Sequence, residues 1–143
     1  MSLEGYKAVI SSGINTSAGE EYSDQPPLYV LDQEFSSVPG DLTCLLNCVG
    51  IFDLLSEDRA SADYKPASTN TDTVKTIINA ILGSTLACYS HCTVWTVVWD
   101  SEDSLVDVYT PKDALRIYEG QSRLSKIRAL LDYTQCVMKV GNE

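Results

Sequence analysis

The sequence predicts an α+β protein, in which a small, mainly antiparallel sheet carries helices packed on it. Three observations support this class. The chain has 143 residues, the usual size of one domain with one core. It is 44% apolar and 21% charged, without a low-complexity tract, which is typical of a globular protein. The expected elements follow the order β-β-α-α-β-β-α-α, and paired strands favour an antiparallel sheet over a doubly wound parallel one. We therefore expect residues 1–143 to form a single domain.

The N-terminal third predicts two short strands separated by a loop. Residues 6–10 and the apolar residues 28–31 read as strands that pair near each other. Residues 11–25 between them are rich in Ser, Gly and Glu, and the pair Pro26-Pro27 follows. This composition is typical of a mobile loop.

A helix that is apolar nearly all round is expected next. Pro39-Gly40 indicates a turn, and Asp41 is placed to cap the helix. The apolar residues that follow recur at helical spacing: Leu42, Leu45, Leu46, Val49, Phe52, Leu54 and Leu55. Such a helix is buried on several sides or lends one side to a partner chain. Residues 56–70 are polar and contain Pro66, so we expect a second exposed, mobile loop.

Two further helices have clear boundary signals. Thr71 or Asp72 can cap a helix that ends at Gly83 and presents Val74, Ile77, Ile78, Ile81 and Leu82 on one face. Ser122 begins a last helix with an inward face of Leu124, Ile127, Leu130, Leu131, Cys136 and Met138, and with Lys126 and Arg128 in water. Between them, Thr110-Pro111-Lys112-Asp113 predicts the start of a short helix that Gly120 ends.

The β-branched and aromatic residues of 93–99 and 105–109 predict an antiparallel hairpin. Trp95 and Trp99 would share one face of its first strand, where they could stack a flat ligand, anchor an interface or pack in the core. With Leu45 and Phe52 of the apolar helix, they are the expected interface or ligand-binding residues.

The net charge of −10 argues against several partners. It repels phosphate backbones and anionic membrane surfaces, so we expect neither nucleic acid nor membrane binding, whereas a basic protein or a cationic ligand stays compatible. The uncharged stretch 76–99 is too polar to span a bilayer. The five cysteines, odd in number and without scaffold spacing, together with no leader peptide, predict a reducing, cytoplasmic location.

The densest chemical cluster contains Cys88, His91 and Cys92. As a metal site, it could combine with Cys44 and Cys48, which would lie one helical turn apart on a single face. As a catalytic site, a thiolate beside the imidazole could perform acyl transfer or redox chemistry. The alternative is interior packing, because cysteine often behaves as a small buried hydrophobe.

Other chemical patterns are weaker. The acidic residues Asp100, Glu102, Asp103 and Asp107 could hold a hard cation, but the glycine and distal glutamate of an EF-hand loop are missing. The pair Glu57-Asp58 falls in an expected loop, where no hydrophobic wall would raise a carboxyl pKa. Phosphate-binding, dinucleotide and nucleophile-elbow motifs are absent from the sequence, so no cofactor is expected.

These patterns favour a non-enzymatic protein-interaction or regulatory module that self-associates, as a homodimer, or binds a protein partner. One alternative is a small thiol- or metal-dependent enzyme built around Cys88, His91 and Cys92. Another is a protein that binds an aromatic or cationic small molecule in a pocket.

Overall fold

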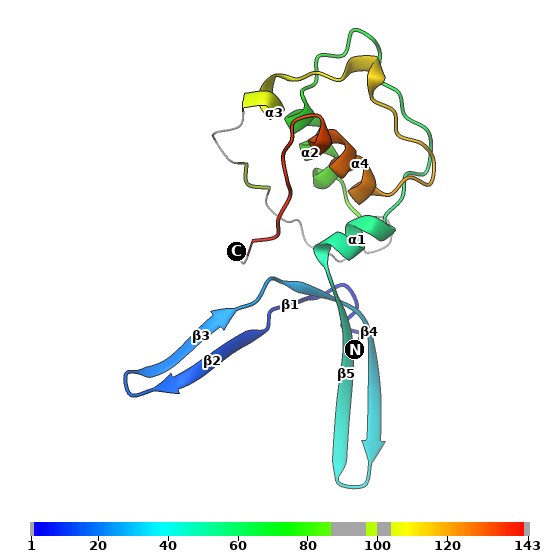
Figure 1. Ribbon diagram of the computed structural model, residues 1–143. Coiled ribbons are helices and arrows are strands. Elements are labelled where there is room, and N and C mark those ends of the chain that lie inside the picture. The colour runs from blue at the N-terminus through cyan, green and yellow to red at the C-terminus, as the bar shows by residue number, and fades with distance from the viewer. Residues whose placement is uncertain (1, 87–96, 100–103, 142–143) are drawn as a thin grey trace. The chain divides into compact units, whose positions relative to one another are not determined.

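The computed structural model describes residues 2–86, 97–99 and 104–141, and contains both strands and helices, so the α+β class is confirmed (Figure 1). The strands are β1 (Lys7–Ala8), β2 (Ser11–Thr16), β3 (Gly19–Asp24), β4 (Leu28–Val38) and β5 (Asp41–Gly50). The helices are α1 (Ile51–Glu57), α2 (Val74–Gly83), α3 (Ser104–Val108), the 3₁₀ turn η1 (Lys112–Ala114) and α4 (Arg123–Asp132).

The described strands all precede the described helices, which differs from the expected paired order. They form two antiparallel sheets, β1-β4-β5 and β2-β3, where one was expected. The chain divides into two compact units, an N-terminal unit that contains Met1–Leu54 and a helical unit that contains Leu55–Cys88 and Val94–Lys139. The single domain stays a prediction, and each unit is described by itself.

The expected helix over 42–55 is wrong for most of its length. Residues Asp41–Gly50 form β5, paired antiparallel with β4, and only Ile51–Glu57 are helical. Pro39 and Gly40 close the β4–β5 hairpin, because Val38 pairs with Asp41 and Gly40 takes the positive φ of 86° that such a turn requires. Asp41 therefore pairs in a strand and does not cap a helix.

The expected loop over 11–25 is also wrong, because β2 and β3 form a hairpin there. Thr16 pairs with Gly19, which leaves Ser17 and Ala18 as the turn. The Thr16 hydroxyl stabilises this turn, since it donates to the Gly19 carbonyl at 2.9 Å and accepts from the Ala18 N–H at 3.2 Å. The short strands expected at 6–10 and 28–31 correspond to β1 and the start of β4, and they do pair, with Lys7 opposite Tyr29.

The helical unit confirms the expected helices α2 and α4. Thr73, not Thr71 or Asp72 as expected, caps α2, because its hydroxyl accepts from the Thr76 N–H at 3.3 Å. The Ser122 hydroxyl caps α4 by accepting from the Ser125 N–H at 3.2 Å. The two helices pack together, and their buried side chains form the core of this unit: Val74, Ile78, Leu82, Leu124, Ile127, Leu130 and Leu131. Cys136 and Met138 lie beyond α4 and are half-buried.

Two expected elements in this unit are different in the structure. The second strand of the expected 93–109 hairpin is the helix α3, in which Val106 is 2% exposed while Leu105 and Val108 face solvent. An ion pair of 2.8 Å between Lys75 of α2 and Asp107 holds α3 against α2. The expected helix after Pro111 is only the η1 turn, because the chain becomes extended at Leu115, whose side chain is buried.

The expected exposed loop over 56–70 is instead tied to residues 117–122. Backbone hydrogen bonds join Tyr64 to Ile117 in both directions, at 2.8 and 2.9 Å, and the Gly120 N–H donates to the Ala60 carbonyl at 2.8 Å. Pro66 within this segment is buried. A polar composition thus does not make this segment a free loop.

Arg123 and Asp58 form a buried ion pair at the start of α4. Asp58 is only 3% exposed, which contradicts the expectation that it lies in a solvated loop. The Arg123 guanidinium also donates to three carbonyls at the end of α2, those of Ile81 at 2.8 Å, Ser84 at 2.6 Å and Thr85 at 3.2 Å. One side chain therefore joins three segments of the helical unit.

Replacing Arg123 is expected to destabilise the helical unit strongly. The change Arg123→Met breaks the ion pair with the buried Asp58 carboxylate, and breaking such a buried pair typically costs about 3–5 kcal/mol. Urea unfolding measures this loss, with Arg128→Met on the exposed side of α4 as the matched control. A loss below about 1 kcal/mol for Arg123→Met would show that the pair is dispensable.

Candidate functional site

One face of the β4–β5 hairpin collects apolar side chains. The register pairs Phe35 with Cys44, Gln33 with Leu46 and Ser37 with Leu42, and paired residues project from the same side of the sheet. Since alternate residues of β5 share a face, Leu42, Cys44 and Leu46 lie on one side together with Phe35 of β4. These four residues define the hairpin face.

The opposite side of the same hairpin is mostly polar. There Glu34 pairs with Leu45, Asp32 with Asn47, Ser36 with Thr43, and Val38 with Asp41. The Asn47 side-chain amide donates to the Asp32 carboxylate at 2.7 Å, which links the two strands across this side. The hairpin is therefore amphipathic, and the charged side chains of its two strands project from the side opposite the hairpin face.

The hairpin face is exposed. Leu42 is 73% exposed, Phe35 60% and Leu46 40%, and Cys44 is exposed as well. Side chains of this kind usually lie in a core, and a contiguous set of them at the surface of a protein marks an interaction site. The hairpin face is the strongest candidate site in the described part of the chain.

Of the expected interface residues, Leu45 and Phe52 lie elsewhere than on the hairpin face. Leu45 is exposed, but on the polar side of the hairpin, opposite Glu34. Phe52 is half-buried in α1. Phe35 was missed, although a Pro-Gly pair between two runs of β-forming residues is a signal for a hairpin that could have found it.

Trp99 belongs to a local cluster on α2. Its indole N–H donates to the Asn79 side-chain oxygen at 2.9 Å, and the Lys75 ammonium lies 5.8 Å from the centre of its ring. Lys75 also pairs with Asp107, the one residue of the expected acidic cation site that the structure describes. Both Trp99 and Asp107 thus contact α2, and their predicted binding roles stay predictions.

The Cys-His cluster falls outside the described residues, and so do the other three acidic residues of the expected cation site. The structure likewise does not describe Cys88, His91, Cys92 and Trp95, so their predicted roles stay predictions. Cys44 and Cys48 are described, and they are four residues apart on an extended strand, not one helical turn apart. That spacing is about 13 Å, too far for one ion to bind both sulfurs at about 2.3 Å. Within the described residues, no three His, Cys, Asp or Glu side chains gather as a metal site.

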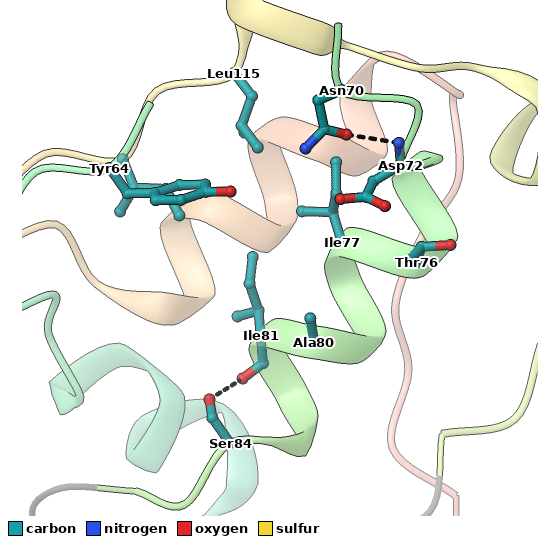
Figure 2. A pocket seen from close by; sticks show the side chains of 10 residues that line it. Tyr64, Asn70, Asp72, Thr76, Ile77, Ala80, Ile81, Ser84 and Leu115 are labelled. Atoms are coloured by element: carbon teal, nitrogen blue, oxygen red, sulfur yellow. Dashed lines mark hydrogen bonds between the residues drawn. The ribbon is translucent and has the colours of Figure 1, made fainter. Parts of the chain in front are cut away.

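A shallow pocket of about 310 Å³ lies beside α2 in the helical unit (Figure 2). Ile77, Ile81 and Leu115 form its apolar wall, and Tyr64 and Asp72 bring a hydroxyl and a carboxylate to its rim. The Asn70 side-chain oxygen accepts from the Asp72 N–H at 2.6 Å and so orders the loop before α2. The pocket could take a small ligand with an apolar body and a cationic group.

Among the residues that the structure describes, two ionisable side chains have shifted pKa values, and neither lies in the hairpin face or in the pocket beside α2. Tyr22 of β3 donates its hydroxyl to Glu20 at 2.8 Å, and this hydrogen bond, with a smaller contribution from desolvation, raises the Tyr22 pKa. Lys126 was expected in water, but it is half-buried, and desolvation lowers its pKa while its ammonium donates to the Arg116 carbonyl.

Comparison of the chain with protein-family models, with curated proteins and with solved structures found no match. In the part of the chain that the structure describes, no helix is both long and apolar enough to cross a membrane.

The Trp99 contact with Asn79 gives a specific spectroscopic prediction. The change Asn79→Leu removes the acceptor, so the indole N–H resonance of Trp99 is expected to shift and to exchange faster with water. Two-dimensional NMR measures both effects once the resonance is assigned with Trp99→Phe. Thr76→Leu, also on α2 and exposed, is the control and should leave the resonance in place.

Proposed function

We propose that the protein is a non-enzymatic interaction module that self-associates through its N-terminal unit. The observation that carries the proposal is the exposed hairpin face of Phe35, Leu42, Cys44 and Leu46. Burying one Leu or Phe side chain contributes about 1.5–3 kcal/mol, so the hairpin faces of two copies together supply the main favourable term that opposes the cost of association.

The length of the hairpin supports the same function. Among the described residues, β1 pairs only with Leu28 and Tyr29 at the base of β4, so the outer part of the hairpin has two strands there. A two-stranded hairpin is marginally stable in water, and stability usually requires a third strand or a covering element. A partner that covers the hairpin face would supply the missing contacts.

Substitution on the two sides of β5 tests the proposal. The change Leu42→Lys places a charge on the hairpin face, whereas Thr43→Lys places the same charge on the neighbouring residue, which projects from the polar side. Light scattering coupled to size exclusion should show a dimer that Leu42→Lys weakens at least about tenfold, corresponding to 1.4 kcal/mol, and that Thr43→Lys leaves nearly unchanged.

A monomer at high concentration would contradict self-association. Equal effects of the two substitutions would mean that the dimer uses another surface. Circular dichroism of both variants shows whether the hairpin survives the change.

A second candidate function is the binding of a small cationic ligand, which the pocket beside α2 favours. Its apolar wall and the Asp72 carboxylate suit an amine with a hydrophobic body. A screen of such amines should raise the melting temperature of the protein, and Ile77→Trp, which fills the pocket, should abolish the shift. A shift that persists in Ile77→Trp would place the ligand elsewhere.

A further inference from the structure

We infer that the pocket beside α2 binds the first residue of a peptide, one with a free amino group and a large apolar side chain. The inference rests on the second candidate function, the binding of a cationic ligand with an apolar body, and names the class of that ligand. It starts from two polar side chains of the pocket, Asn70 and Asp72, which lie two residues apart and are joined by a hydrogen bond.

This hydrogen bond fixes the orientation of the Asn70 amide. The Asp72 backbone N–H can only donate, so the atom of Asn70 that accepts from it at 2.6 Å is the amide oxygen. The amide nitrogen is therefore the other end of the group, and Figure 2 shows it turned toward Ile77 and Leu115 of the apolar wall. Asn70 thus offers the pocket a hydrogen-bond donor, and a carbonyl oxygen is an acceptor that fits it.

The Asp72 carboxylate favours an ammonium group at the same rim. Figure 2 shows this carboxylate beside Ile77, and the ion pairs of the described residues, Lys75–Asp107 and Arg123–Asp58, do not involve it. The net charge of −10 also attracts cations and repels a second carboxylate, such as that of a free amino acid. The ligand group near Asp72 is therefore cationic, and the acceptor near Asn70 is a neutral carbonyl.

The apolar wall has room for one large side chain. Ile77, Ile81 and Leu115 form this wall, and Figure 2 shows the Tyr64 hydroxyl pointing toward it. The volume of about 310 Å³ is near the lower end of the range for small-molecule sites. The α-carbon of an N-terminal residue carries an ammonium, a carbonyl and a side chain together, so it matches all three features of the pocket. Because the pocket is shallow, the rest of the peptide can continue into solvent.

The walls of the pocket are held in place by contacts within the helical unit. Arg123 donates to the carbonyls of Ile81 at 2.8 Å and Ser84 at 2.6 Å, which fixes the end of α2. Tyr64 is joined to Ile117 by backbone hydrogen bonds in both directions, at 2.8 and 2.9 Å. A preformed site loses little conformational entropy on binding, so a few matched groups can give a specific complex.

Matched small molecules test the three features separately. Two-dimensional NMR at about pH 6.5 follows binding, since an α-amino group with a pKa of about 7.7–8.0 is charged there. Leucinamide has all three groups, whereas isoamylamine lacks the carbonyl, N-acetylleucinamide lacks the charge and glycinamide lacks the side chain. Leucinamide should shift the amide resonances of Ile77 and Ile81 and bind at least about threefold more tightly than each of the others. A tripeptide amide that begins with leucine should bind at least as tightly as leucinamide.

Two substitutions test the assigned donor and the assigned charge. Asn70→Asp keeps an oxygen that can accept from the Asp72 N–H but removes the donor, so the preference for leucinamide over isoamylamine should disappear. Asp72→Asn should weaken the binding of both amines at least about threefold. Asp132→Asn removes the same charge at the end of α4, outside the pocket, and should leave binding unchanged. The α2 resonances of each variant show whether the pocket stays folded.

The outcomes separate the peptide inference from the second candidate function. Equal affinities for leucinamide and isoamylamine would overturn the inference and leave a cationic pocket intact, and so would a tripeptide that fails to bind. N-acetylleucinamide that binds as tightly as leucinamide would overturn both, because the charge would then be irrelevant. Amines that shift no resonance of the pocket residues would also overturn both.

Discussion

The helical unit depends on one guanidinium group. Arg123 sits at the first position of α4, pairs with the buried carboxylate of Asp58 and donates to carbonyls at the end of α2. The carbonyls at a helix C-terminus have no partners inside the helix and carry partial negative charge, so a cation there satisfies hydrogen bonds and charge together. Because the Arg123 N–H also donates to the Asp58 carbonyl at 2.9 Å, the segment before α2, the end of α2 and the start of α4 are fixed by one residue.

The two units bury their apolar residues in different ways. In the helical unit, Leu124, Ile127 and Leu130 are enclosed with the inner face of α2, and the polar caps Thr73 and Ser122 stabilise the helix starts. In the N-terminal unit, Tyr29 and Val30 at the base of β4 are buried, while the apolar residues further along the hairpin are exposed. The helical unit encloses the inner faces of α2 and α4, whereas the hairpin leaves its apolar face exposed in the described part of the chain.

Local signals predicted α2 and α4 well, and β2, β3 and β5 poorly. Thr73 and Ser122 are caps next to apolar runs of helical period, so α2 and α4 could be located within a residue or two. In β5 the adjacent apolar pair Leu45-Leu46 fits the spacing of a buried helix face. Only the pairing with β4 shows that these two side chains project from opposite sides of a strand. The extra residue of β4 between Val30 and Asp32 shifts the alternation of that strand, so Val30 and Phe35, five residues apart, share a side. The candidate site depends on this pairing, and no short stretch of sequence contains it.

The hairpin face changes gradually from its base to its tip. Val30 and Cys48 at the base are buried and half-buried, and exposure then rises through Leu46 and Phe35 to Leu42 beside the Pro39-Gly40 turn. Local opening costs least where side-chain contacts are fewest, so the amide protons near the tip should exchange with solvent first and those near the base last. The hairpin is therefore expected to open first at its tip, and a molecule that covers the tip would slow the exchange of those amide protons most.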